Sequence, residues 1–314
     1  MPIPQILNSR MWNNSNIRNV IKHILKEEFK NARVKIDECI IAGGQIHGKE
    51  DYALVKTRDR NYKAKVKVVR ELIDNGTELL YMIDLDTGYA EGMNSHGIGI
   101  VNSALLVSED EKAADAYWKR MNKKDSPSND GPRIYNALKQ TTLASAIKEL
   151  ISFESGLKGH TIIGNAEAMY SVEMTSKHNP IVKKLDPSTG FDVRTNHGQG
   201  HSTAGYTPES DPEAYMSSKL RKLTAEIELN GVTNSDDLAP ALAKQSFEKE
   251  NPHNMVRRTA GMRTVSQIAM NLDKKIFSFY LFPNECTYNG LEDKTPDEYT
   301  SQIKFKLVKW NETS

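Results

Sequence analysis

The amino-acid sequence predicts an α+β protein in which helices lie outside paired β-sheets. Residues 38–106 carry short runs rich in Val, Ile, Leu and Tyr, separated by turn signals. Residues 109–153 instead carry apolar positions at helical spacing, and strand patterns then return around one further helix. This succession of sheet, helix pair, sheet, helix and sheet is typical of a layered α+β fold.

The first segment, residues 1–38, is expected to contain an amphipathic helix. Ser15 or Asn16 is a suitable N-cap for it. Its apolar residues recur three and four positions apart, at Ile17, Val20, Ile21, Ile24, Leu25 and Phe29. Two interpretations stay open, an ordinary first helix packed on the core or the helix of a removable pro-segment.

Closely spaced strands are expected between Cys39 and Val107, with short turns between them. Asn75-Gly76 is the strongest hairpin signal among those turns. Short turns between neighbouring strands imply an antiparallel sheet. The expected strands cover residues 38–42, 52–57, 63–69, 78–84 and 98–106.

The rest of the chain alternates between helices and further strands. Helices are expected at 109–121 and 134–153, on either side of a breaker cluster at 125–132, and at 213–229. Strands are expected at 159–164, 168–175, 181–186, 264–271, 275–282 and 301–307. No internal repeat or linker is visible, so residues 39–314 are predicted to form a single domain.

Composition restricts the partners of the protein. The 42 basic and 41 acidic side chains nearly cancel, so no net field points to nucleic acid or to an anionic membrane surface. Two cysteines are too few for a disulfide framework, and no apolar run approaches the ~20 residues that span a bilayer. The N-terminus also lacks the pattern of a secretory signal. These features predict a soluble cytoplasmic protein, with homo-oligomerisation left open.

Residues suited to amide chemistry follow one another in a particular order along the chain. They are Cys39-Ile40-Ile41, Lys56-Thr57-Arg58-Asp59-Arg60, Gly92-Met93-Asn94-Ser95-His96-Gly97 with Asn102, and Thr195-Asn196-His197. From about residue 39 to residue 282, this order resembles the N-terminal-nucleophile amide hydrolases of the choloylglycine hydrolase and isopenicillin N acyltransferase group. The resemblance implies a four-layer αββα fold, and cleavage between Glu38 and Cys39 that makes the nucleophilic Cys39 the first residue.

Elementary acid–base chemistry explains why such a cysteine should be N-terminal. A thiol of pKa ~8.5 is only partly ionised at neutral pH, whereas a free α-amine with a pKa of ~7.7 to 8.0 can accept its proton. The resemblance assigns Asp59 to holding that amine. The alternatives are a small buried side chain for Cys39 and, for Asp59, a turn charge beside Arg58 and Arg60.

Attack on an amide creates an oxyanion, which requires fixed hydrogen-bond donors. The resemblance assigns this task to Asn196, with Asn102 as a second pocket residue, although an Asn at a strand end often only begins a turn. Arg263 matches a late active-site arginine of the group. Its alternative is an ordinary surface salt bridge.

Lys56, Arg58 and His197 are expected to contact substrate. Many choloylglycine hydrolases carry Arg where this chain has Lys56, and because Lys offers a point charge without a planar fork, bile-salt-like substrates are disfavoured. His197 and His201 lack the further ligands that a zinc site needs, so neither a metal nor a cofactor is expected.

The sequence therefore predicts an N-terminal-cysteine amidase or acylase that acts on a linear small-molecule or peptide-like amide through a thioester. Acyl transfer to an amine uses the same acyl-enzyme and is the nearest alternative. The other alternative is a non-catalytic binding protein of the same fold that keeps residues 1–38.

Overall fold

The computed structural model describes residues 37–49, 51–105, 130–152, 159–175, 178–244, 251, 253–259 and 261–310. The helices predicted over residues 17–29 and 109–121, and residues 1–36 of the predicted pro-segment, lie outside these described residues. The part of the chain that begins at Asp37 belongs to one compact unit. Within its described residues, no helix is long and apolar enough to cross a bilayer.

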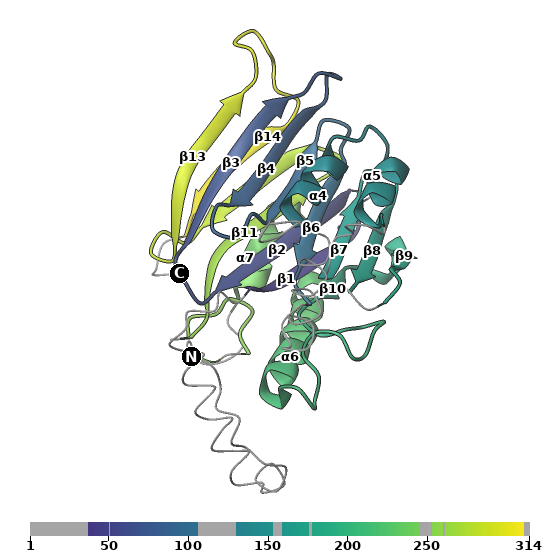
Figure 1. Cartoon of the computed structure of the whole chain (residues 1–314), viewed down its shortest axis with the longest axis vertical. Helices are drawn as coiled ribbons and strands as arrows, with labels where there is room; N and C mark the ends of the chain where they lie inside the picture. Colours follow the sequence, from purple (N-terminus) through teal and green to yellow (C-terminus); the bar gives the residue numbers. More distant parts are fainter. Residues whose placement is uncertain are drawn as a thin grey trace, which may run out of the picture. The chain divides into compact units, whose positions relative to one another are not determined.

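Two β-sheets organise the described residues (Figure 1). The first has six strands in the order β10, β1, β2, β11, β12 and β14, antiparallel except for the edge pair β12–β14. In that order the strands are Asp192–Arg194, Asp37–Gln45, Tyr52–Arg60, Arg263–Asn271, Ile276–Leu281 and Lys304–Lys309.

The second sheet has eight described strands in the order β13, β3, β4, β5, β6, β7, β8 and β9, antiparallel except for the edge pair β13–β3. In that order they are Cys286–Lys294, Ala64–Leu72, Glu78–Asp84, Ala90–Asn94, Gly99–Ser103, Gly159–Gly164, Met169–Met174 and Ile181–Lys184. The hairpin between β3 and β4 turns at the predicted Asn75-Gly76, where Gly76 has φ +81°, a left-handed conformation that glycine adopts without steric cost.

The helices cover the outer faces of the two sheets. The helices α4 (Asp130–Leu138) and α5 (Leu143–Leu150) pack on the eight-stranded sheet through a core that includes Ile134, Ala146 and Ile100. The helices α6 (Pro212–Leu229) and α7 (Leu238–Ala243) pack on the six-stranded sheet. One-turn 3-10 helices lie at Pro187–Thr189 and Ser235–Asp237.

The largest core lies between the sheets, where β1 and β2 face β6 and β7. It joins Ile41 and Leu54 of one sheet to Val66, Leu80 and Ile162 of the other. Burying each such side chain contributes about 1.5–3 kcal/mol, so this core holds the two sheets face to face. With helices on both outer faces, the predicted α+β class and its four αββα layers are confirmed (Figure 1).

Gly43 shows how closely the sheets approach beside the site. A Cβ atom built on this residue would lie 2.6 Å from a methyl carbon of Ile162, 2.6 Å from the sulfur of Met169 and 2.7 Å from Leu54. Any larger residue there would force these side chains apart. The close approach keeps β1, which carries Cys39, packed against the opposite sheet.

Several predicted boundaries differ from the structure. The single helix expected over residues 134–153 is two helices, because Thr142 caps the second one and accepts a hydrogen bond from the Ser145 backbone. The strands β5, β10 and β13 were not predicted. The expected antiparallel pairing is correct for most neighbours and wrong at the two parallel edge pairs.

Candidate active site

The candidate site begins at the start of β1, where Glu38 and Cys39 are both buried. Successive side chains of a strand point to opposite faces. Ile40 packs in the core beneath α6 and α7, whereas Ile41 packs in the core between the sheets. Glu38 therefore lies on the α6 face of the sheet, and the thiol of Cys39 lies on the face toward the other sheet.

On the α6 face, five buried residues form what we call the arginine cluster: Glu38, Asp59, Tyr206, Arg221 and Arg257. Arg257 and Arg221 donate to one oxygen of Glu38 at 2.7 and 2.8 Å, and the Tyr206 hydroxyl donates to the other at 2.9 Å. Asp59 lies directly opposite Glu38 in the β1–β2 ladder and is 3.5 Å from Arg221. Two carboxylates thus share two guanidinium groups inside the protein.

The two carboxylates of the cluster differ electrostatically. Burial raises the pKa of the Glu38 carboxyl, but Arg257 and Arg221 together outweigh burial, so that pKa is held below its usual value. Burial also raises the pKa of Asp59, and there the two arginines and a 2.6 Å hydrogen bond from the Thr264 hydroxyl do not fully offset it. The negative charge of Glu38 adds to this rise, so removing Glu38 would make Asp59 more acidic.

A β-bulge brings Thr264 to Asp59. The register between β2 and β11 pairs Asp59 with Thr264 and Arg58 with Ser266, which leaves Val265 as the extra residue. Bulges of this kind re-aim side chains and occur often beside active sites. Here the bulge supplies the hydroxyl donor that fixes the Asp59 carboxylate.

Asn196 connects the arginine cluster to Cys39. Its Oδ1 atom accepts a hydrogen bond from the Cys39 backbone N–H at 3.3 Å and another from Arg221 at 3.2 Å. Its Nδ2 atom donates to the Ala104 carbonyl at 2.8 Å and to the Ser103 hydroxyl at 3.3 Å. Two N–H groups donate to the Oδ1 atom, and the Nδ2 atom donates to a carbonyl, so the assignment of oxygen and nitrogen in this amide is consistent. Asn196 thus presents its oxygen to Cys39. The predicted donation to an oxyanion would use the Nδ2 atom, which here donates to Ala104 and Ser103 instead.

On the opposite face of β1 and β2 lies what we call the inner ion network, which consists of Lys56, Arg58, Arg60, Asp84 and Glu91, all fully buried. Asp84 accepts hydrogen bonds from Arg58 at 3.1 Å and from Arg60 at 3.2 Å. Glu91 pairs with Arg58 and with Lys56. The arginines hold the pKa of each carboxyl below its usual value against the opposing effect of burial. Each of the three basic side chains therefore pairs with at least one of the two carboxylates.

Cys39 lies beside the inner ion network. It is the direct cross-strand partner of Arg58, so both side chains share one face of the sheet. The Arg58 Nε atom is buried and has no hydrogen-bond partner in the described part of the chain. The Cys39 side chain therefore lies on the same buried face as a guanidinium group.

The structure does not bring Asn102 to Cys39. In β6, Val101 packs between the sheets and Ile100 packs under α4 and α5, so Asn102 shares the outer face with Ile100. Its amide nitrogen donates to a carbonyl and a hydroxyl of β7. Its neighbour Ser103 reaches the site instead and donates to the Cys39 carbonyl at 3.3 Å.

Arg263 also lies outside the site. Its side chain is 51% exposed and pairs with Glu285 at 2.9 Å on the surface, which was the alternative considered from the sequence. In the strand register Arg263 is the partner of Arg60, and its neighbour Thr264 is the residue that faces Asp59. The arginines that lie beside Glu38 are Arg257 and Arg221, rather than the predicted Arg263.

The residues expected to contact substrate are buried in the uncut chain. Lys56 and Arg58 belong to the inner ion network. His197 is held through Nδ1 by the hydroxyls of Ser218 at 2.8 Å and Thr195 at 3.1 Å, and burial lowers its pKa to about 4. These contacts make His197 a neutral support of the segment that carries Asn196.

Sequence reasoning did not identify Tyr206, Arg221 or Arg257. Arg221 did leave a signal, because the buried stripe of α6 runs from Arg221 through Ala225 to Leu229 at helical spacing. A charged residue on a buried stripe requires a partner of opposite charge. Nothing comparable marks Arg257, which lies in an irregular segment before β11.

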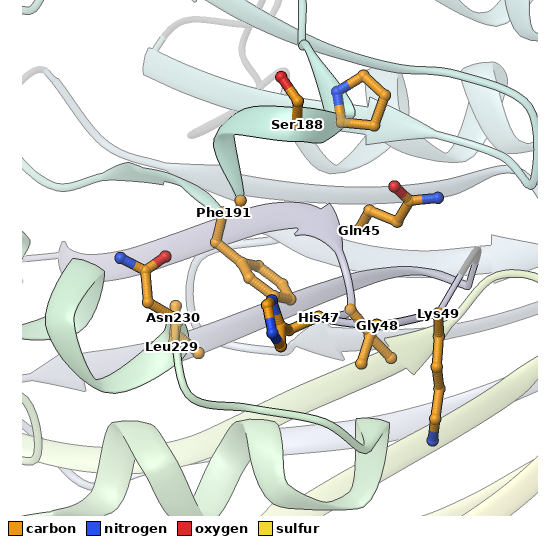
Figure 2. Close-up of a pocket in the computed structure, with 11 residues that line it drawn as sticks. Gln45, His47, Gly48, Lys49, Ser188, Phe191, Leu229 and Asn230 are labelled. Atoms are coloured by element: carbon orange, nitrogen blue, oxygen red, sulfur yellow. The ribbon is translucent and has the colours of Figure 1, made fainter.

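No metal site is visible in the part of the chain that the structure describes, where no group of three His, Cys, Asp or Glu side chains converges. A hollow of ≈ 610 Å³ is lined by Gln45, His47, Phe191 and Asn230, among others, and these residues are drawn in Figure 2. It lies at the other end of β1 from Cys39, about 20 Å away for a strand that rises ~3.3 Å per residue. None of the site residues described above lines this hollow.

Comparisons with known proteins found similarity to solved structures. No protein-family model matches the chain, and no curated protein matches it. Among solved structures, an N-acylethanolamine-hydrolyzing acid amidase ortholog from Caenorhabditis elegans has 14% identity and a TM-score of 0.49, covering 74% of this chain and 93% of its own. Penicillin V acylase from Agrobacterium tumefaciens has 10% identity and a TM-score of 0.45, covering 85% of this chain and 99% of its own.

Proposed function

We propose that this chain is the precursor of an N-terminal-cysteine amidase or acylase. It cleaves itself between Glu38 and Cys39 and then hydrolyses a linear C–N amide bond through a thioester on Cys39. The observation that carries this proposal is the setting of Cys39, whose backbone nitrogen lies 3.3 Å from the Asn196 oxygen while its thiol shares a face with Arg58.

The self-cleavage step uses atoms that are already adjacent. The Cys39 sulfur attacks the Glu38 carbonyl carbon, an S–C bond forms, the C–N bond breaks, and the thiol proton passes to the released nitrogen. Water then attacks the thioester, which frees the thiol and leaves Glu38 with a new carboxylate. Asn196 Oδ1 is already positioned to accept a hydrogen bond from the new α-amine.

The mature residue then combines nucleophile and base. The α-amine of Cys39 accepts the thiol proton, the sulfur attacks the substrate carbonyl, and the same proton passes to the leaving amine. Asn196 and Arg221 hold the amine side of this arrangement, and Arg58 of the inner ion network lies on the thiol side. Water resolves the thioester in hydrolysis, and a second amine would resolve it in acyl transfer.

N-terminal sequencing and intact mass of the purified protein test the proposal. We expect a chain that begins at Cys39, and a thioester adduct on Cys39 after incubation with a panel of acyl amides. A protein that keeps residues 1–38 and forms no adduct with any amide would instead be the binding protein of the alternative interpretation. A protein that keeps residues 1–38 yet turns over amides would contradict the proposed role of the α-amine.

A further inference from the structure

The residues around Glu38 enclose the acyl group that is attacked in self-cleavage. In self-cleavage, Glu38 is the residue whose carbonyl is attacked, so it becomes the acyl group of the first thioester. A substrate's acyl group is attacked by the same sulfur and forms the same kind of thioester. The side chains that now enclose Glu38 are therefore available, once Glu38 has left, to enclose the acyl group of a substrate.

Those side chains recognise a carboxylate. Arg257, Arg221 and Tyr206 each donate one hydrogen bond to the Glu38 carboxylate, at 2.7, 2.8 and 2.9 Å. All three donors are buried, with Arg221 fully enclosed. Hydrogen bonds from arginine to a carboxylate are among the strongest in proteins, and no neutral group of the same size accepts as well from three donors.

Charge balance leads to the same ligand. With Glu38 in place, the two guanidinium groups face two carboxylates, those of Glu38 and Asp59. When Glu38 leaves, Asp59 is the remaining carboxylate in the cluster. The two buried guanidinium groups then have one negative charge fewer beside them, so the emptied pocket favours an anion. The lowered pKa of the Glu38 carboxyl shows that the pocket prefers the ionised form of its occupant.

We propose that the mature enzyme selects amides whose acyl chain ends in a carboxylate, with a glutaryl or α-glutamyl group as the best fit. This inference rests on the proposed amidase function. The length follows from Glu38 itself, because the path from its carbonyl carbon through the side chain to the carboxylate is that of a glutaryl group. A succinyl group is one methylene too short to reach both arginines, and an adipyl group is one too long.

A substrate series tests the inference in the mature wild-type enzyme. Glutaryl, succinyl, adipyl and pentanoyl amides of one chromogenic amine are compared by kcat/KM, with pentanoyl as the neutral analogue of glutaryl. A pocket built for a buried polar group discriminates strongly, so we expect glutaryl to exceed pentanoyl by at least about 10²-fold. Equal rates for glutaryl and pentanoyl would overturn the inference and leave the amidase function standing.

Variants locate the selectivity in the arginine cluster. Arg257→Gln and Tyr206→Phe should each lower the glutaryl-to-pentanoyl ratio of kcat/KM by at least about tenfold, because each removes one donor to the carboxylate. Arg263→Gln, which removes an exposed arginine, is the matched control and should keep the ratio. An unchanged ratio in both cluster variants would place recognition elsewhere and contradict the inference.

A binding experiment separates this inference from catalysis. The full-length double variant Glu38→Gly/Cys39→Ala has no nucleophile at position 39 and lacks the three side-chain carbons of Glu38, the number of carbons in propionate. Refolded in sodium propionate, it should have a higher Tm than in sodium chloride of equal concentration, because propionate fills the emptied pocket. Cys39→Ala alone keeps Glu38 and should show no such difference.

The kinetic series and the propionate experiment give independent outcomes. A propionate effect without any amide hydrolysis would keep the carboxylate pocket and reject the enzyme. Amide hydrolysis without a preference for acyl chains that end in a carboxylate would keep the enzyme and reject the carboxylate pocket. If the double variant does not fold in either salt, the kinetic series alone decides, and its outcome supports or overturns the inference as stated above.

Discussion

The backbone nitrogen of Cys39 lies 3.3 Å from the side-chain oxygen of Asn196, a residue 157 positions later in the chain. Antiparallel pairing of β10 with β1 creates this contact, because Ile41 and Arg194 are partners and the segment after β10 passes the start of β1. The nitrogen that becomes a free amine in the proposed mechanism is therefore already held by Asn196 in the intact chain. The Asn196 oxygen is held in turn by Arg221, which also binds Glu38.

The first prediction concerns Asn196. Asn196→Ala removes the acceptor for the Cys39 nitrogen, so turnover should fall by ~10²-fold or more with a smaller change in KM. Steady-state kinetics on the best amide substrate across pH checks this. A change in KM alone would make Asn196 a substrate contact.

A second prediction concerns Asp59. Asp59→Asn removes the carboxylate that pairs with Arg221 and receives the Thr264 hydroxyl, and turnover should fall by at least about tenfold, or ~1.4 kcal/mol of transition-state stabilisation. Asp51→Asn is the matched control, because Asp51 pairs with Lys274 and lies just before the other end of β2. Wild-type turnover by a folded Asp59→Asn enzyme would remove Asp59 from the site.

A third prediction compares two arginines in the uncleavable Cys39→Ala background. Arg257→Ala leaves the buried Glu38 carboxylate with one guanidinium fewer, and breaking a buried pair of this kind costs about 3–5 kcal/mol. Arg263→Ala removes an exposed pair with Glu285, which is worth about 0–1 kcal/mol. Urea unfolding of both variants measures the difference. Similar losses would contradict the burial assigned to Arg257.

Local sequence patterns predicted much of the fold. The strand at Glu78–Asp84 was predicted with its observed bounds, and so was the strand at Gly159–Gly164, because each is an apolar run bounded by turn residues. The strand Cys286–Lys294 was not predicted, because it alternates buried and exposed positions at a sheet edge and is rich in polar residues. Its partner β3 lies more than two hundred residues earlier, and no local pattern reports such a pairing.

The candidate site was predictable only where a motif marked it. Cys39, Asp59 and Asn196 belong to recognisable motifs, and the structure brings all three into one connected set of contacts. Asn102 and Arg263 belong to motifs as well, but strand alternation turns Asn102 away, and Arg263 forms an exposed pair with Glu285. Tertiary packing alone brings Arg221 and Arg257 to Glu38, so their pairing required the structure.

A fourth prediction concerns acid stability. Burial lowers the pKa of His197 to about 4 in the folded chain, whereas an unfolded histidine titrates near 6.5. The unfolded chain therefore binds a proton between pH 6.5 and 4 that the folded chain does not bind, and stability falls as pH falls through that window, by at most about 3 kcal/mol. Above pH ~6.5 this contribution is fully present.

Urea unfolding at several pH values checks this dependence. His197→Gln should flatten the slope of unfolding free energy against pH between 6.5 and 4, and the exposed His96→Gln should not. His160, whose pKa burial also lowers to about 4, remains in both variants and keeps part of the slope. Equal slopes for wild type and His197→Gln would contradict the buried, neutral state of His197.

The last prediction is that the atom at the Cys39 Sγ position controls both maturation and activity. Cys39→Ala lacks a nucleophile and should remain full length and inactive. Cys39→Ser keeps a nucleophile of similar size, but a hydroxyl ionises far less readily than a thiol and is the weaker nucleophile. Cys39→Ser should therefore cleave at the same bond and more slowly, which intact mass over a time course after purification measures. Because a substrate and Glu38 are attacked by the same atom, the residual amidase rate of Cys39→Ser should fall along with its cleavage rate. Cleavage of Cys39→Ala at wild-type rate would mean that another protein cuts the chain, and Cys39 would then be the nucleophile for substrate only.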